Sequence, residues 1–186
     1  MGPPARCRRA GPLERGQTRR KSSTGKRPKG PNGFRCGARG SRVTLYLDTS
    51  SLVKLYVAEP GSEAVRKLVD AATIVATSSI AYTETRAALA RRRRERVLRP
   101  KAFASAKKTL ETEWSQYLTV EMTSALCRQA GEFAEHYRLR AYDSMHLAAF
   151  AEVAREAGVR ETRFSSFDDA LNRAAHSLRR TLTRAR

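Results

Sequence analysis

Short β-branched and apolar runs alternate with longer segments of helical spacing through the last 144 residues of this 186-residue chain. The candidate strands lie at 43–47, 73–76, 118–122 and 162–165. Each strand is followed by one or two helices, which begin at signals such as Asp48 and end at signals such as Gly158. Strands that alternate with helices in this way predict an α/β fold with a parallel sheet covered on both faces.

Seven helices fill the segments that follow the strands. They are expected at about 49–59, 62–70, 79–94, 100–117, 124–137, 141–157 and 168–179. In open parallel sheets the ligand crevice lies outside the carboxyl ends of the strands, so functional side chains are sought there.

Positive charge is concentrated in residues 1–42, which hold 13 basic residues and one acid and so carry +12 of the net charge of +19. Only eight of these residues are hydrophobic, too few to offset the entropy lost on ordering the segment. We therefore expect 1–42 to be a disordered basic extension and 43–186 to be the folded domain. The domain keeps a charge of +7, which suggests an anionic partner.

Several classes of protein are disfavoured by the same composition. No apolar run approaches the roughly 18–20 residues of a membrane span, and residues 1–42 lack the apolar core of a signal peptide. Cys7, Cys36 and Cys127 form neither a disulfide framework nor a zinc-binding spacing. We therefore expect a cytoplasmic protein.

Four acids occupy positions where a parallel α/β protein places its site. Asp48 follows the first strand, Glu84 lies in the helix after the second, Asp143 begins an apolar helix, and Asp168 follows the fourth strand. Carboxylates about 4 Å apart repel by about 4 kcal/mol per pair at an effective dielectric of about 20, so such a cluster requires a cation. Oxygen ligands select Mg²⁺ or Mn²⁺.

Each of these acids also has a purely structural interpretation. Asp48, Asp143 and Asp168 all lie near helix N-termini, where an Asp satisfies free backbone N–H groups. Glu84 can equally be a solvated residue on a helix face. The residues alone leave both interpretations open.

The segments around the four acids resemble the motifs of PIN-domain ribonucleases, specifically the VapC-type toxins of toxin–antitoxin pairs. These segments are 45–56 (LYLDTSSLVKLY), 79–89 (SIAYTETRAAL), 139–148 (LRAYDSMHLA) and 164–171 (FSSFDDAL). The resemblance runs in order from Val43 to about Ala175. Because Val43 opens what looks like a complete domain, we also expect the native protein to start there.

The resemblance implies a three-layer α/β/α fold with a short central parallel sheet of four or five strands. It also implies a homodimer, a small cognate antitoxin, and Mg²⁺- or Mn²⁺-dependent RNA cleavage that leaves 5′-phosphate and 3′-hydroxyl ends. By position, Asp48, Glu84 and Asp143 would be the metal ligands, and Asp168, favoured by register over its neighbour, would complete the acidic pocket. The Ser50 hydroxyl would orient an acid or a metal-bound water, and Ser165 is expected to do likewise.

Basic residues near the acids are candidates for contact with RNA phosphates. They are Arg91, Arg92, Arg138 and Arg140, with further basic residues between 93 and 108. His146, one turn after Asp143, is interpreted as a satisfied core residue. Trp114 and the Tyr and Phe residues fit helix faces and are likewise interpreted as core.

Other aspartate-based α/β classes fit less well. A haloacid-dehalogenase-type phosphatase needs a second Asp where Ser50 stands, and a response-regulator receiver needs a phosphoacceptor Asp near Met122, where the chain has none. The remaining alternative is a non-catalytic basic RNA-binding module whose acids only cap helices.

Overall fold

The computed structural model of the protein describes residues 43–184. The expectations for residues 1–42, a disordered extension and a native start at Val43, lie outside the described residues. The strands are β1 (Thr44–Leu47), β2 (Ile74–Ser78), β3 (Leu118–Val120) and β4 (Thr162–Ser165). The helices are α1 (Thr49–Tyr56), α2 (Ser62–Ala71), α3 (Ile80–Arg94), α4 (Pro100–Trp114), α5 (Ser124–Tyr137), α6 (Ala141–Ala157) and α7 (Asp169–Arg184).

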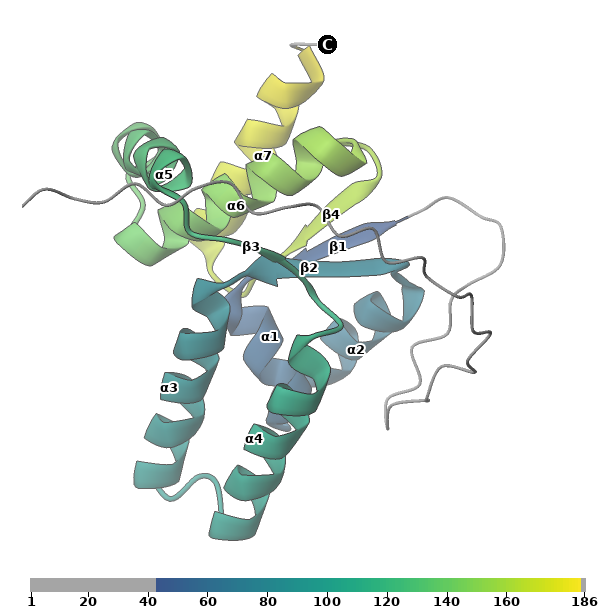
Figure 1. The fold of residues 1–186 in the computed structure, drawn as a ribbon, viewed down its shortest axis with the longest axis vertical. Coiled ribbons are helices and arrows are strands. Elements are labelled where there is room, and N and C mark those ends of the chain that lie inside the picture. The colour runs from purple at the N-terminus through teal and green to yellow at the C-terminus, as the bar shows by residue number, and fades with distance from the viewer. Residues whose placement is uncertain (1–42, 185–186) are drawn as a thin grey trace, which may run out of the picture.

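The elements of the described part follow the order expected from the sequence, four strands and seven helices, as Figure 1 shows. Three helix ends differ from the expectation. Helix α1 stops at Tyr56 because Val57 is already extended, α4 ends at Trp114 rather than near Tyr117, and α7 continues to Arg184. The predicted α/β class is confirmed.

All four strands are parallel and pair in the order β3-β2-β1-β4. Tyr46 at the centre of β1 is opposite Ala76 on β2 and Phe164 on β4. Since the strands run in one direction, their carboxyl ends lie along one edge of the sheet. Asp48 and Ser166 come directly after two neighbouring strands at this edge.

Helices cover both faces of the sheet and give the three layers that were expected, with α5, α6 and α7 on one side and α1 to α4 on the other (Figure 1). Successive side chains of a strand point to opposite faces. Tyr46 accordingly packs in the cluster formed by the α5–α7 layer, whereas Leu45 and Leu47 pack with α1 and α2.

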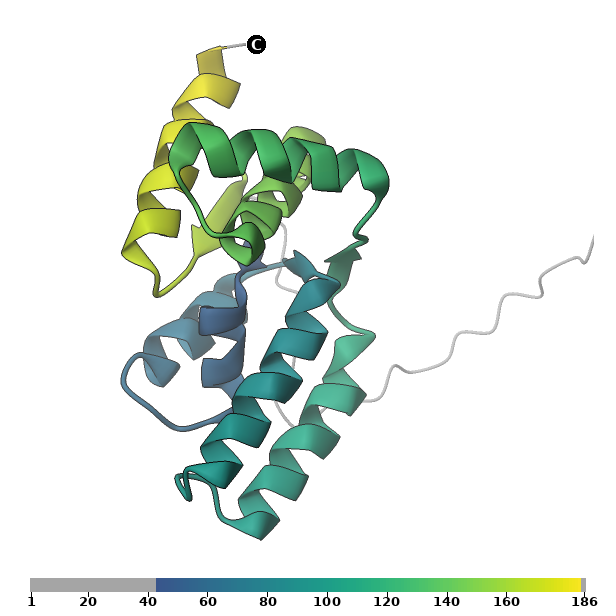
Figure 2. The same ribbon diagram turned by 90° about the vertical axis from the view of Figure 1, so that its left-hand side faces the viewer.

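Helices α3 and α4 form a hairpin that extends away from the sheet, as Figure 2 shows. An ion pair between Arg86 and Glu111, with N and O 2.6 Å apart, links the two helices. The run Arg91–Arg94 ends α3 and therefore lies at the far end of the hairpin. Among residues 43–184 no helix has both the length and the apolarity needed to cross a membrane.

Candidate active site at the carboxyl ends of the strands

Asp48 is held by hydrogen bonds on both of its carboxylate oxygens. It caps the N-terminus of α1, where the Ser51 backbone N–H donates to Oδ1 at 2.9 Å. The Ser50 hydroxyl donates to Oδ1 and Oδ2 at 2.8 and 2.9 Å, and the Ser166 hydroxyl donates to Oδ2 at 2.8 Å. Asp48 is therefore a helix cap and at the same time a fixed, buried carboxylate.

The loop between β4 and α7 is fastened to Asp48 by the same two hydroxyls. Ser50 Oγ accepts from the Phe167 backbone N–H at 2.7 Å, and Ser166 Oγ accepts from the Asp168 N–H at 2.9 Å. The Asp168 carboxylate accepts from the Leu171 N–H at 2.8 Å and so caps α7. These contacts bring Asp168 to the end of β1.

Asp143 lies in the first turn of α6, in a place where other negative charges act on it. Burial raises its pKa, and the carboxylates of Asp168 and Asp48 raise it further, against a lowering by Arg140 and His146. Asp48, Asp143 and Asp168 therefore lie in the same region, at the edge of the sheet where β1 and β4 end. Asp143 is not the N-cap of α6, since that position is occupied by Arg140.

Glu84 is hydrogen-bonded to Thr49, the residue that follows Asp48, and to His146. The Thr49 hydroxyl donates to Glu84 Oε2 at 2.5 Å, and His146 Nε2 lies 2.9 Å from the same oxygen. Burial raises the pKa of Glu84, but the hydrogen bonds from His146 and Thr49 outweigh it and leave the pKa below its ordinary value. Glu84 is thus a satisfied, ionised carboxylate.

His146 is a buried core residue, as expected, with only 2% of its surface exposed, and both of its ring nitrogens have partners. Nδ1 lies 3.0 Å from the Tyr46 hydroxyl. Burial and the charges of Asp48 and Glu84 raise the pKa of Tyr46 well above its ordinary value, so the phenol stays protonated and donates to Nδ1. Nε2 then carries the proton and donates toward Glu84. A chain of hydrogen bonds therefore runs from β1 through α6 to α3.

The four arginines expected to contact substrate differ in their surroundings. Arg91, Arg138 and Arg140 are exposed or partly exposed, and Arg140 is close enough to lower the pKa of Asp143. Arg92 instead pairs with Glu59, and its side chain is only 21% exposed. Glu59 also binds Lys54 at 2.8 Å, so Arg92 belongs to an ion-pair network that fastens α3 to the segment after α1.

The acids fit a hard divalent cation in the chemistry of their donors. Asp48, Asp143 and Asp168 offer only oxygen, and the raised pKa of Asp143 records a repulsion that a cation would remove. In the described range 43–184, however, no three His, Cys, Asp or Glu side chains have the spacing of a metal site. The carboxylates therefore offer suitable donor atoms but do not form a ready-made metal site.

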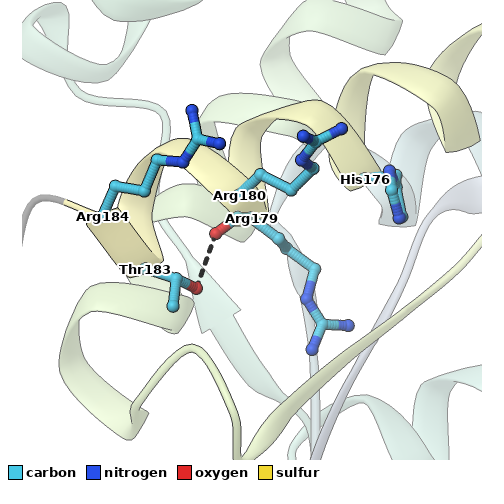
Figure 3. A pocket seen from close by; sticks show the side chains of 5 residues that line it. All are labelled: His176, Arg179, Arg180, Thr183 and Arg184. Carbon is cyan, nitrogen blue, oxygen red and sulfur yellow. Dashed lines mark hydrogen bonds between the residues drawn. The ribbon is translucent and has the colours of Figure 1, made fainter.

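A pocket of about 540 Å³ lies elsewhere, on the last turns of α7, and is drawn in Figure 3. It is lined by His176, Arg179, Arg180, Thr183 and Arg184. Counting 1.5 Å per residue, the lining residues are roughly 10–22 Å along the helix from its start beside the acids. None of these lining residues is a carboxylate, so the chemistry expected of the acids does not belong to this pocket.

Two features of the site differ from the sequence-based expectations or were missed by them. Ser165 hydrogen-bonds Ser51 Oγ at 3.0 Å, and its neighbour Ser166 is the residue that bonds Asp48. The interpretation of all aromatic residues as core was wrong for Tyr142 and Phe167, which are 57% and 49% exposed. Their positions directly before Asp143 and Asp168 were the sequence feature that could have indicated their exposure at the site.

The fold and the acid cluster agree with a comparison against known families. The sequence profile of the PIN domain matches residues 45–177. The chain therefore belongs to the PIN-domain family, whose nucleases generally use divalent metal ions.

Within that family the chain is homologous to VapC ribonucleases. It is 36% identical over 109 residues to Ribonuclease VapC45 of Mycobacterium tuberculosis strain CDC 1551 / Oshkosh and to Ribonuclease VapC49 of strain ATCC 25618 / H37Rv. In each case the match covers 59% of this chain and 76% of the relative.

Among solved structures, the crystal structure of PAE2754 from Pyrobaculum aerophilum is similar in fold. It covers 77% of this chain and 91% of its own, with a TM-score of 0.50 and 20% sequence identity. The expected three-layer PIN fold is confirmed.

Proposed function

We propose that this chain is a Mg²⁺- or Mn²⁺-dependent ribonuclease and the toxin of a toxin–antitoxin pair. The observation that supports the proposal is the placement of Asp48 and Asp168 directly beyond the neighbouring parallel strands β1 and β4, linked through Ser166, with Asp143 near enough to feel both charges. Homology to VapC ribonucleases supports RNA as the substrate and a small antitoxin as the partner. We further propose that the protein is a cytoplasmic homodimer.

In this proposal Asp48, Asp143 and Glu84 hold the ion, and Asp168 completes the acidic pocket. A bound divalent ion would supply Lewis-acid stabilisation of the charge that develops on the phosphoryl group. Ser50 keeps Asp48 in one orientation through its two hydrogen bonds to that carboxylate. His146 and Thr49 do the same for Glu84.

The substrate phosphates would be bound by basic side chains on two sides of the acids. Arg138 and Arg140 immediately precede Asp143, and Arg91 and Arg92 lie about 10 Å beyond Glu84 along α3. Arg91 offers the more exposed side chain of the latter pair, while Arg92 adds its charge from within the pairing with Glu59.

The second candidate function is a non-catalytic RNA-binding module whose acids only cap helices. It is favoured by Asp48 and Asp168, each of which accepts a backbone N–H bond at a helix start. Asp143 and Glu84 cap no helix, and this weighs against it.

Incubation of the full chain with total RNA separates the two candidates. With Mg²⁺ or Mn²⁺ the wild type should cut RNA to products with 5′-phosphate ends, and EDTA should stop the cleavage. The Asp48→Asn and Asp143→Asn variants should bind RNA as well as the wild type or better and cut nothing, because Asn keeps the shape and the capping ability of Asp.

A matched control is Asp169→Asn, which alters an exposed acid next to Asp168 and should cut normally. If the wild type binds RNA but never cuts it with either ion, the non-catalytic candidate holds. If Asp169→Asn loses activity and Asp168→Asn does not, the fourth acid is Asp169.

The toxin assignment has its own test. Expression of the wild type in a bacterial host should slow growth, and co-expression of a small protein encoded next to it should restore growth. Expression of Asp143→Asn should leave growth unchanged. A wild type that cuts RNA in vitro but leaves growth unaffected would contradict the toxin assignment while leaving the proposed ribonuclease activity supported.

A further inference from the structure

Two aromatic side chains stand exposed beside the acid cluster. Tyr142 directly precedes Asp143 and is 57% exposed, and Phe167 directly precedes Asp168 and is 49% exposed. The other large hydrophobic side chains with comparable exposure in residues 43–184 are aliphatic: Ile74, Val97 and Leu118. The exposed rings of the described region are therefore confined to positions adjacent to two proposed site acids.

Phe167 is fixed in place although half of its surface is open. Its backbone N–H donates to Ser50 Oγ, the hydroxyl that orients Asp48. The buried ammonium of Lys54 lies 4.1 Å from the ring centroid, against one face. Position 61 favours glycine because its backbone φ is +91°, and a Cβ there would lie 2.5 Å from Phe167 Cε1 unless the ring moved. The solvent-facing part of the ring is what Lys54 and Gly61 leave uncovered.

Tyr142 is in the first turn of α6, and its neighbours along the chain are charged. Arg140 caps that helix, Arg138 precedes it in a left-handed conformation, and both are exposed. Asp143 follows directly. Along the chain, Tyr142 thus stands between basic residues that suit phosphates and a proposed acid of the site.

We propose that Tyr142 and Phe167 are base-stacking platforms that bind nucleobases of single-stranded RNA on either side of the phosphate held at the acids; the inference rests on the function proposed above. Stacking on aromatic rings combined with a basic surface is how proteins bind single strands with little sequence preference. The cores of protein–protein interfaces are depleted of charged residues, whereas Phe167 lies against the Lys54 ammonium and Tyr142 has exposed arginines and Asp143 beside it in the chain. The surroundings therefore favour RNA over a protein partner.

The test measures binding in EDTA, which prevents cleavage, to a single-stranded RNA of about 12 nucleotides that carries 2-aminopurine at its centre. The full chain should bind and quench the fluorophore by stacking. Tyr142→Ala and Phe167→Leu should each weaken binding about five- to tenfold and relieve the quenching. Leucine at 167 keeps most of the side-chain volume over Lys54 and removes only the π-face.

Conservative aromatic variants and a charge variant serve as controls that separate stacking from phosphate contact. Tyr142→Phe and Phe167→Tyr should retain wild-type affinity and quenching. Val97→Ala removes an exposed apolar side chain away from the site and should also bind normally. Because the rings neutralise no phosphate, Tyr142→Ala should leave the salt dependence of binding unchanged, whereas Arg140→Ala should reduce the slope by about 0.7.

The outcomes separate this inference from the proposed function. If the wild type neither binds nor cuts RNA, the proposed function fails, and this inference fails with it. If the wild type binds and cuts RNA but Tyr142→Ala and Phe167→Leu bind and quench normally while unfolding at the wild-type temperature, the stacking inference alone is overturned. It is also overturned if these variants change the oligomeric state, measured by size exclusion over a range of concentrations, and leave RNA affinity unaltered.

Discussion

Glu84 and Asp143 belong to the same candidate site, yet their surroundings move their pKa values in opposite directions. On the Glu84 side, the hydrogen bonds from His146 and Thr49 outweigh burial and lower the pKa. On the Asp143 side, burial and two neighbouring carboxylates raise it. One side of the site is satisfied by the protein itself, and the other carries negative charge that Arg140 and His146 compensate only in part.

The difference indicates that the acids have two roles, one structural and one in binding a cation. The Glu84 side is a rigid support, in which Tyr46 fixes the ring of His146 and His146 fixes the carboxylate. The Asp143 side is where an added cation would gain most, because it would cancel an existing repulsion. The predictions below test these two roles, beginning with the largest expected effect.

The aspartate side should dominate activity. We expect Asp143→Asn to lower kcat/KM for RNA cleavage by at least about 100-fold, and Glu84→Gln by about tenfold, because Glu84 Oε2 is already engaged by two protein donors. Steady-state cleavage of a fluorescent RNA at saturating Mg²⁺ measures both. Equal losses would remove the functional distinction between the two sides.

The support side should dominate stability. Replacing His146 by Leu leaves the buried Tyr46 hydroxyl without its acceptor and Glu84 without one donor. We expect the free energy of unfolding to fall by about 2–4 kcal/mol, measured by urea denaturation. The exposed His136 provides the control, and His136→Leu should change stability by less than about 0.5 kcal/mol. Similar losses of stability for the two variants would contradict a stabilising role of the hydrogen-bond chain from Tyr46 through His146 to Glu84.

Neutralising the two acids should shift stability in opposite directions. Asp143→Asn removes a repelled charge and should raise the midpoint of thermal unfolding by roughly 1–3 °C, while Glu84→Gln removes a favoured charge and should lower it by a similar amount. Differential scanning calorimetry without divalent ions, at neutral pH, is the measurement. Shifts of the same sign would show that the two environments are not opposed.

The smallest expected effect is the pH dependence of those two stability differences. The folded pKa of Glu84 lies below 4.5, so its contribution is complete above that value and is lost as the pH falls through the folded pKa. The folded pKa of Asp143 lies above 3.8, so its unfavourable contribution is present above the folded pKa and disappears as the pH falls toward 3.8. Urea midpoints of the wild type and both variants between about pH 3 and pH 7 would record the two trends. Differences that stay constant over this range would contradict them.

The sequence predicted the elements of the fold well because the chain marks them locally. Asp48 and Gly158 delimit helices by capping chemistry, and the β-branched runs have no competing helical period. The α/β class followed from the alternation alone. The convergence of Asp48 and Asp168 was predictable for the same reason, since both follow parallel strands that turned out to be neighbours.

The partners of the acids could not be predicted, because they depend on which side chains the tertiary fold brings together. Thr49 and Glu84 are 35 positions apart, and Tyr46 and His146 are 100 apart. His146 was expected to be buried, but burial alone did not reveal that it touches a site acid. Phe167 looks like a core residue in the sequence, and only the arrangement of Gly61 and Lys54 shows why the ring stays at the surface.

Asp48 is both a helix cap and a proposed acid of the site, and this has a consequence for how the protein can evolve. Its capping bond to Ser51 is one that Asn, Ser or Thr can also make, whereas its negative charge has no such substitutes. Under the proposed function, a single replacement at position 48 would silence the chemistry while keeping the helix cap. Descendants that keep the shape while abandoning the activity are expected to carry Asn, Ser or Thr at this position.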